Sequence, residues 1–585
     1  MRSRAVLAAV VIAILALWGR LLYLQVLQHQ PLKDRVGSLY DRRVVMTAER
    51  GRIYDRKGTI LALSTPGRSV YVDPNEVEDL GATAARLAAA LGLDSGQVYS
   101  LLFSPPARHF AWIKRLVAPA QEAAVRALQL PGVYIREEPM RYYPNGALAA
   151  HLLGFASIDQ DGLSGVEFAF DARLRGTNGR RYEGRDGRAR SICTPEGAYI
   201  PAVNGRSIVL TIDTNVQDFL ETAMDRCFQQ YSPVSVTGIV MDPKSGDILA
   251  LAERPVFDPN KYTEYPEEYR RVRAVTDPFE PGSMFKPFVF SAALQEGAVH
   301  LNDVFFCYNG SYQVGPRVLH DAHPYGNLTG LEVVVKSSNI GMAQVGQRLG
   351  AQKAANYLTA FGFGRPTGVG LTGEAAGSLA PARQWTMYTI TSVPMGHEVS
   401  VTALQVASAF SAIANGGLLI KPRILRGVMS PDGCVLERYT EPEILSRVLD
   451  ESTARTMITN VLRKVISEGT GRLADIEDYD LAGKTGTAQK VVDGVFSHDK
   501  YVSSFVCAGP VQDPRLVVLI VVNEPSRGAS LYGGTVAAPY CAEVIKSTLD
   551  YMYIDSRRRS NGVRLASADE RPTSAKRKQG AGNAP

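Results

Sequence analysis

Three short runs of polar residues decide the fold and the chemistry of this 585-residue chain. In chain order they are Ser283-Met284-Phe285-Lys286, Ser337-Ser338-Asn339 and Lys484-Thr485-Gly486-Thr487. They supply a serine nucleophile with an amine beside it, a second hydroxyl with an amide, and a cationic strand for a carboxylate. These groups together open an acyl bond next to a free carboxylate. Each run alone arises by chance, but the ordered set indicates an acyl-transfer site.

The first run lies in a setting that suits a nucleophile. The breaker residues Glu280-Pro281-Gly282 precede Ser283 and a mostly apolar segment, 284–294, follows it, which predicts a turn opening a buried helix. Lys286, three residues after Ser283, would share its helix face. A half-buried lysine loses part of its preference for the charged form and can act as a base. The alternative, a capping serine beside a solvated lysine, is weak once the other two runs are present.

The third run is typical of a strand that enters a hairpin. Gly486 would let a substrate backbone approach closely, and Thr485 and Thr487 offer hydroxyl groups. The segment 483–485 also imitates the end of a phosphate-binding loop, but that motif needs a glycine at position 478, which is Asp. No strand–loop–helix pattern follows, so we reject a nucleotide site here.

Strand-like patterns open and close the second part of the chain, and helical patterns lie between them, which favours an α+β fold. Strands are expected at 207–213, 236–241, 248–253, 503–509 and 516–522, and helices from 215 onward, at 401–414 and at 537–553.

The three runs resemble those of the class B penicillin-binding proteins, the monofunctional serine D,D-transpeptidases of bacterial cell walls. The resemblance covers nearly the whole chain. It also rests on RGRIYDRKG at 50–58, RYYP at 141–144, HLLG at 151–154, GLSGVE at 162–167 and DPKSGDILA at 242–250. It implies a transpeptidase domain, an antiparallel sheet flanked by helices, on an elongated mixed pedestal domain with one N-terminal transmembrane helix.

This resemblance and the composition along the chain predict five parts. They are a cytoplasmic tail (1–4), a transmembrane anchor (5–27), a pedestal of the class B dimerisation type (28–204), the transpeptidase domain (205–555) and a basic disordered tail (556–585). Within the pedestal, two alanine-rich helices are expected at 82–91 and 118–130. We expect the stretch 50–58 to be a structural turn with ion pairs around Asp55, rather than a basic binding loop.

The resemblance further implies a substrate and residue roles. The substrate would be a peptidoglycan stem peptide that ends in D-Ala-D-Ala. Ser283 would attack the penultimate carbonyl, and Lys286 would take its proton. Ser337 would relay a proton to the leaving nitrogen, and Asn339 would hold the substrate amide and Lys286.

The third run would bind the end of the peptide. Lys484, with Thr485 and Thr487, would anchor the terminal carboxylate beside Gly486. The backbone N–H groups of Ser283 and Thr487 would form the oxyanion hole. β-Lactams would acylate the serine as substrate mimics. The chemistry implied needs neither a metal nor an organic cofactor.

Within class B, two stretches lean toward the division-specific septal enzymes: 72–77 (VDPNEV) and 484–489 (KTGTAQ). That subtype implies a lipid II glycosyltransferase of the shape-elongation-division-sporulation family and other divisome proteins as partners. An elongation- or spore-specific transpeptidase stays open. So do a β-lactam-sensing or β-lactam-hydrolysing relative and a catalytically silent scaffold.

The N-terminus carries the one candidate for a membrane span. The uncharged run 5–19 covers roughly 22 Å as a helix, and extending it to Leu27 gives roughly 34 Å, enough for a ~30 Å hydrocarbon core. Arg2 and Arg4 precede it, which favours a cytoplasmic N-terminus. No Ala-x-Ala cleavage site follows directly, so we expect an uncleaved single-pass anchor in the bacterial inner membrane, with the catalytic domain on the periplasmic or extracellular side.

The net charge of +6 does not indicate a nucleic-acid partner. The tail from 556 holds eight Lys and Arg residues against Asp569 and Glu570, which accounts for all of it. The rest of the chain is close to neutral, so no basic face for nucleic acid is expected. The overall 45% hydrophobic and 21% charged content is ordinary for a globular protein.

Cysteine and histidine residues give no metal spacing. The six cysteines, at 193, 227, 307, 434, 507 and 541, form no close pair and are expected to be mainly buried thiols. His320-Asp321-Ala322-His323 could begin a metal site, but no third ligand motif accompanies it. We therefore expect a structural loop packed near the second run.

Overall fold

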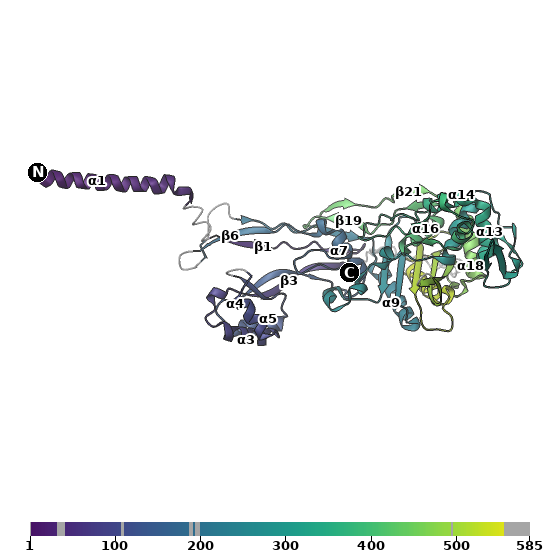
Figure 1. Cartoon of the computed structure of the whole chain (residues 1–585), viewed down its shortest axis with the longest axis horizontal. Helices are drawn as coiled ribbons and strands as arrows, with labels where there is room; N and C mark the ends of the chain where they lie inside the picture. Colours follow the sequence, from purple (N-terminus) through teal and green to yellow (C-terminus); the bar gives the residue numbers. More distant parts are fainter. Residues whose placement is uncertain are drawn as a thin grey trace, which may run out of the picture.

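The computed structural model describes residues 2–31, 41–106, 110–185, 191–192, 199–492 and 495–554. Figure 1 shows an elongated molecule with a helix at one end, a mixed head at the other, and long strands between them. The predicted tail 556–585 and Cys193 lie outside the described residues.

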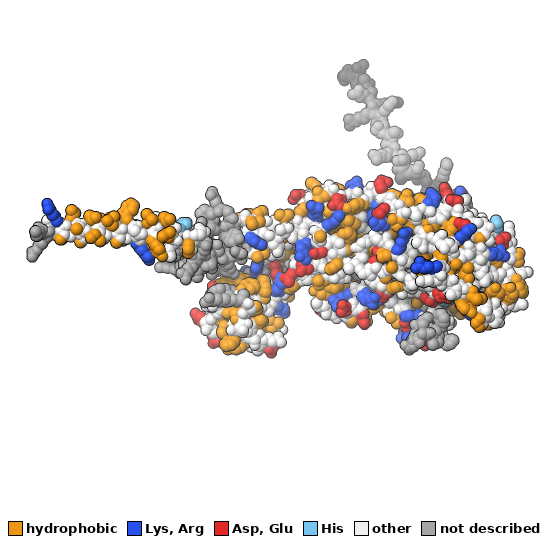
Figure 2. Space-filling model, turned by 45° about the horizontal axis from the view of Figure 1, so that its top comes forward, with side chains coloured by type: hydrophobic (Ala, Val, Ile, Leu, Met, Phe, Trp, Pro, Cys, Tyr) orange, Lys and Arg blue, Asp and Glu red, His pale blue; other side chains and the backbone are white. Residues whose placement is uncertain are grey.

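The N-terminal helix is exposed along its whole length. Helix α1 (Arg2–Leu22) continues into a π-helical turn, η1 (Tyr23–Leu27). The span Ser3–Leu27 has a mean hydropathy of 2.4 and none of it is buried, and Figure 2 shows apolar side chains covering it. A helix this long and apolar fits a single-pass membrane anchor, as predicted for 5–27.

Two sheets build the pedestal. The first is antiparallel and contains β1 (Asp41–Met46), β6 (Gly179–Arg185), β7 (Ser191–Ile192) and β8 (Tyr199–Ile200). The second has seven strands, namely β2 (Ile53–Tyr54), β3 (Ile60–Val72), β4 (Ala111–Lys114), β5 (Val133–Tyr142), β9 (Ser207–Leu210), β19 (Leu425–Met429) and β20 (Val435–Arg438). β9 pairs in parallel with β2 on one side and antiparallel with β19 on the other, which joins the early and late parts of the chain in one sheet.

A small helical module packs on the end of β3. It consists of α3 (Leu80–Leu91), α4 (Ser95–Phe103) and α5 (Pro119–Leu128). Its core joins Val70 and Val72 of β3 to Leu87 and Leu91 of α3. The two predicted alanine-rich helices are confirmed as α3 and α5, whereas α4 was not predicted.

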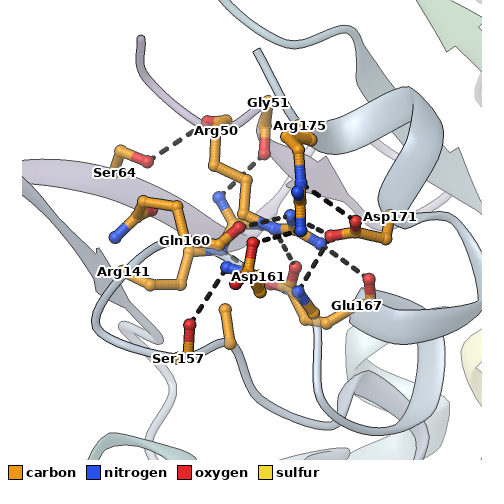
Figure 3. Close-up of polar contacts among 12 residues, drawn as sticks. Arg50, Gly51, Ser64, Arg141, Ser157, Gln160, Asp161, Glu167, Asp171 and Arg175 are labelled. Carbon is orange, nitrogen blue, oxygen red and sulfur yellow. Dashed lines mark hydrogen bonds and ion pairs between the residues drawn. The ribbon is translucent and has the colours of Figure 1, made fainter. Parts of the chain in front are cut away.

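A buried ion-pair cluster holds the pedestal loops together (Figure 3). The Arg50 guanidinium contacts Glu167 (2.5 Å) and Asp171 (2.6 Å), and Arg141 contacts the other oxygen of Glu167 (2.6 Å). Neither Arg50 nor Glu167 exposes its side chain. Burial alone would lower the pKa of Arg50, but Glu167 and Asp171 outweigh burial and raise it. Glu167 lies in α7 (Gly165–Ala169), Asp171 opens α8 (Asp171–Leu174), Arg141 lies in β5, and Arg50 lies between β1 and β2.

The prediction of ion pairs around Asp55 is wrong. Asp55 instead accepts hydrogen bonds from the backbone N–H groups of Lys57 and Thr59 (both 2.8 Å) and from the Thr214 hydroxyl (2.7 Å). Its carboxylate closes a turn, while the ion pairs of this stretch centre on Arg50. The stretch 50–58 has a structural role, as predicted, but its ion pairs are made by Arg50 and not by Asp55.

An antiparallel sheet forms the centre of the head. Its order is β11 (Ile248–Arg254), β10 (Ser235–Met241), β24 (Leu516–Asn523), β23 (Val495–Gly509) and β22 (Ala482–Val492). Helices α9 (Thr214–Tyr231) and α20 (Ala538–Tyr551) pack on one face, and α16 (Ala403–Ala414) packs on the other. Every residue of β10 and β11 is buried, because helices cover both faces. The α+β fold and the predicted β10–β11 hairpin are confirmed.

Shorter elements complete the head around α11 (Lys286–Gln295) and α13 (Asn339–Leu349). The helices are α6 (Ala150–Leu153, at the pedestal junction), α10 (Arg273–Thr276), α12 (Gly330–Val335), α14 (Ala351–Ala360), α15 (Thr389–Ser392), α17 (Glu451–Thr456), α18 (Arg463–Ser467) and α19 (Gly533–Val536). The strands are β12 (Val304–Phe306), β13 (Ser311–Val314), β14 (Arg317–His320), β15 (Asn327–Thr329), β16 (Ser378–Leu379), β17 (Val399–Ser400), β18 (Leu418–Ile420) and β21 (Ile444–Arg447).

The cysteines are mostly buried, as predicted. Cys227, Cys307, Cys507 and Cys541 are buried free thiols. Cys434 is the exception among the described cysteines, because it lies in the exposed turn between β19 and β20.

The Glu167 cluster gives a stability prediction. Glu167→Ala would leave two buried guanidinium groups without their shared carboxylate, which costs about 3–5 kcal/mol in the free energy of unfolding. Urea unfolding of the full chain in detergent measures this. The control Glu137→Ala removes an exposed partner of Arg68 and should change the unfolding midpoint little. Equal shifts for the two variants would show that the buried pairs do not hold the pedestal.

Candidate active site

Ser283 lies in a tight turn that packs against the strand carrying the third run. The turn is a 3-10 segment, Gly282–Phe285, and the α-helix begins only at Lys286, one turn later than predicted. A Cβ at Gly486 would lie 3.0 Å from both the Pro281 carbonyl oxygen and the Met284 Cβ. Gly486 therefore lets the nucleophile's turn approach β22. Within the described part of the chain, the Ser283 hydroxyl has no hydrogen-bond partner.

Lys286 is fully buried and points at the second run. Its Nζ donates to the Ser337 carbonyl oxygen (2.5 Å), the Ser337 hydroxyl (3.1 Å) and the Asn339 side-chain oxygen (2.9 Å). These three acceptors match the three donors of an ammonium group. Burial lowers the pKa of Lys286 to about 7, although nearby Asp321 acts in the opposite direction. At neutral pH a large share of this lysine is a free amine.

Lys484 reaches the same serine from the opposite side. Its Nζ donates to the Ser337 hydroxyl (3.0 Å) and to the Thr485 carbonyl oxygen (3.1 Å). Burial lowers the pKa of Lys484 well below its usual value, and the charge of Lys286 adds to the effect. The two lysines occupy both acceptor positions of the Ser337 hydroxyl, so its proton is free to be donated elsewhere.

The backbone of the second run is held in place by Asp321. Its carboxylate accepts hydrogen bonds from the N–H groups of Asn339 (2.5 Å) and Ile340 (3.1 Å) and from the Ser338 hydroxyl (2.7 Å). Ser338 in turn caps α13 at the Gly341 N–H (2.9 Å). The predicted structural loop near the second run is confirmed, but its anchoring role could not be read from sequence, because Asp321 and Asn339 meet only in the fold.

The two threonines of the third run contact residues that sequence reasoning missed. The Thr485 hydroxyl lies 2.8 Å from that of Thr470, and the Thr487 hydroxyl accepts from the Gly533 N–H (3.0 Å) at the start of α19. No sequence motif that we recognised marked Thr470 or Gly533. Together with the lysine contacts, the structure brings the three runs, far apart in the chain, into one site.

Comparison with known proteins agrees with this geometry. The Penicillin binding protein transpeptidase domain matches residues 236–546, and the Penicillin-binding Protein dimerisation domain matches residues 45–210. The chain belongs to the class B penicillin-binding proteins. Its head is a transpeptidase domain, and the chain is an enzyme of the peptidoglycan D,D-transpeptidase class.

Relatives whose names indicate different roles are similar to this chain over most of their length. Stage V sporulation protein D of Bacillus subtilis is 34% identical, over 94% of this chain and 85% of its own. Peptidoglycan D,D-transpeptidase FtsI of Escherichia coli is 31% identical, over 93% and 91%. The crystal structure of penicillin-binding protein 3 from Mycobacterium tuberculosis complexed with aztreonam is 29% identical, with a TM-score of 0.69, over 88% of this chain and 98% of that one.

Asp321 gives a prediction for the site. Asp321→Asn removes a charged acceptor from two backbone N–H groups and a hydroxyl, so the free energy of unfolding should fall by about 1–3 kcal/mol. The matched control is Asp303→Asn, because Asp303 also contacts α13, through Arg348, but at its exposed face. Urea unfolding of both variants measures the difference. A loss no greater than that of the control would contradict the anchoring role.

Proposed function

We propose that this chain cross-links peptidoglycan stem peptides ending in D-Ala-D-Ala through an acyl-enzyme on Ser283. The observation that carries this proposal is the pair of buried lysines that share the Ser337 hydroxyl. It supports a base that is neutral near pH 7 and a hydroxyl that is ready to donate a proton.

In the proposed reaction, Lys286 takes the proton of Ser283 as the hydroxyl attacks the penultimate carbonyl. Ser337 then passes its proton to the leaving nitrogen and takes up the proton held by Lys286, so D-alanine departs and the amine of Lys286 is restored. An amine of a neighbouring strand attacks the acyl-enzyme and loses a proton to Lys286, which returns it to Ser283 as the cross-link forms. Asn339 holds Lys286 in place, and its side-chain N–H group donates to His320 O (3.0 Å) before substrate arrives.

The third run is proposed to hold the peptide terminus. Lys484 supplies positive charge to the site, and the hydroxyls of Thr485 and Thr487 bind the terminal carboxylate beside it. Backbone N–H groups of Ser283 and Thr487 form the oxyanion hole. A β-lactam, which carries a carboxylate next to a strained amide, would occupy the same positions and acylate Ser283 covalently.

We further propose a septal role in cell division, with a lipid II glycosyltransferase of the shape-elongation-division-sporulation family and other divisome proteins as partners. The similarity to FtsI supports this subtype, and the similarity to Stage V sporulation protein D keeps a spore-specific role as the alternative. We also propose that the chain divides into an anchor (5–27), a pedestal (28–204) and a transpeptidase domain (205–555). The transpeptidase domain would lie outside the cytoplasmic membrane.

A β-lactam-hydrolysing or β-lactam-sensing relative is a second candidate, because it would share the three runs. The measurement that separates them is the lifetime of the penicilloyl adduct. A transpeptidase retains the adduct over many minutes of chase, whereas a hydrolase releases it and turns over.

The first functional prediction concerns the nucleophile. Ser283→Ala should abolish labelling by a fluorescent penicillin while the thermal unfolding midpoint stays unchanged. The control Ser291→Ala alters a buried serine of α11, the helix that follows Ser283. Its hydroxyl donates to the Phe288 carbonyl oxygen (2.9 Å), and this variant should keep its labelling. Undiminished labelling of Ser283→Ala would disprove the mechanism.

The second functional prediction separates the two lysines and includes pH. Acylation should speed up as pH rises through about 7, because deprotonation frees Lys286 as the base. Lys286→Ala should lower the acylation rate by about 10²–10⁴-fold and remove this pH dependence. Lys484→Ala should mainly raise the penicillin concentration needed for half-maximal rate. Stopped-flow acylation measures both quantities, and identical defects in the two variants would contradict the assigned roles.

A further inference from the structure

An arginine-lined cavity lies on the seven-stranded sheet that joins the pedestal to the head. Its volume is about 240 Å³. Residues of β9, β19 and β20 contribute a mostly apolar lining, and three arginines face it: Arg56, Arg426 and Arg438. Figure 1 places β19 in the middle of the molecule, well away from α1. None of the residues that line the cavity belongs to the three runs of the catalytic site.

The acidic residues of this region are paired with other arginines. Asp247 contacts the Arg423 guanidinium at 2.6 Å. Glu437, which lines the cavity, contacts Arg173 at 2.7 Å and accepts a hydrogen bond from the Tyr439 hydroxyl. Each carboxylate therefore has a direct partner outside the three cavity arginines, and Asp247 acts on Arg56 and Arg426 only through space.

The three cavity arginines therefore have no direct ionic partner within the described part of the chain. Among the residues that the structure describes, Arg56, Arg426 and Arg438 make no ion pair and no side-chain hydrogen bond. Partial burial lowers the pKa of Arg426. Its cationic neighbours, Arg56, Arg423 and Arg438, add to this effect, and Asp247 opposes it. Like charges gathered in a concave, partly dehydrated site attract an anion.

We propose that this cavity binds a phosphate or diphosphate group. Guanidinium groups present planar pairs of N–H donors that match the oxygens of phosphate. Three unpaired cations suit a multiply charged anion better than a single carboxylate. The volume is below the roughly 300–1,000 Å³ of a site for a drug-sized ligand, which fits a small anionic group.

Calorimetric titration of the full chain in detergent tests the proposal. Inorganic diphosphate, added at constant ionic strength, should bind saturably to the wild type. Arg426→Gln should weaken this binding at least tenfold, without lowering the thermal midpoint of the ligand-free protein, because it relieves repulsion. Arg438→Gln, at an exposed position, should also weaken diphosphate binding. If Arg426→Gln is unstable, the affinity of Arg438→Gln tests the proposal instead. The control Arg383→Gln changes an exposed arginine elsewhere on the head and should bind normally.

The source of the phosphate is distinguished by the choice of probe. Inorganic phosphate and diphosphate represent free anions, and glycerophosphoglycerol represents the phosphodiester of a polymer or a lipid headgroup. Binding of the diester as tight as that of diphosphate assigns the site to an esterified phosphate; a preference for diphosphate assigns it to a free anion. Absence of saturable binding by all three probes, or equal affinities in the wild type and both cavity variants, overturns the proposal.

Discussion

Two buried lysine side chains meet at one serine hydroxyl, and the rest of the head is arranged around this contact. Lys286 and Lys484 each lie about 3 Å from the Ser337 hydroxyl. Placing two cations in a buried site is unfavourable unless one of them gives up its proton. The fold reduces the cost with carbonyl and amide oxygens and with Asp321 close by. The lowered lysine pKa values follow from this arrangement.

The same burial makes stability depend on pH. The folded chain releases the proton of Lys286 near pH 7, whereas an unfolded lysine holds it up to about 10.5. Between these values the unfolded chain binds more protons, so this group makes the folded state more stable as pH rises through that window. Below about pH 7 Lys286 is a buried ammonium group, and the folded state then bears the whole desolvation penalty of that charge. The site thus sacrifices stability for a base that is usable at neutral pH.

Much of this architecture was predictable from local patterns. The strand pairs of the head follow from short apolar runs bounded by Pro, Gly and Asp, and α16 and α20 follow from apolar helices with clear ends. The three runs indicated the site because their residue types carry the chemistry directly. The expected role of Asp55 was wrong because a carboxylate near basic residues in sequence need not pair with them in space.

Long-range contacts account for what the sequence did not reveal. Asp321 and Thr470, in loops, and Gly533, at the start of α19, contact the site because the whole fold sets their spatial neighbours. Ser337, whose hydroxyl both lysines share, has a left-handed backbone (φ 58°). A serine at this position does not predict that conformation. The buried Glu167 cluster likewise depends on partners more than 100 residues from Arg50.

Nuclear magnetic resonance titration of ¹³C-labelled lysine tests the central claim most directly. Comparison with Lys286→Ala and Lys484→Ala would assign the two signals. We predict that one lysine of the pair titrates with an apparent pKa near 7, because burial and the neighbouring cation disfavour two charges at Ser337. If both lysines stayed protonated to above pH 10, the shared hydroxyl would not be poised between a free amine and an ammonium, and the account would be wrong.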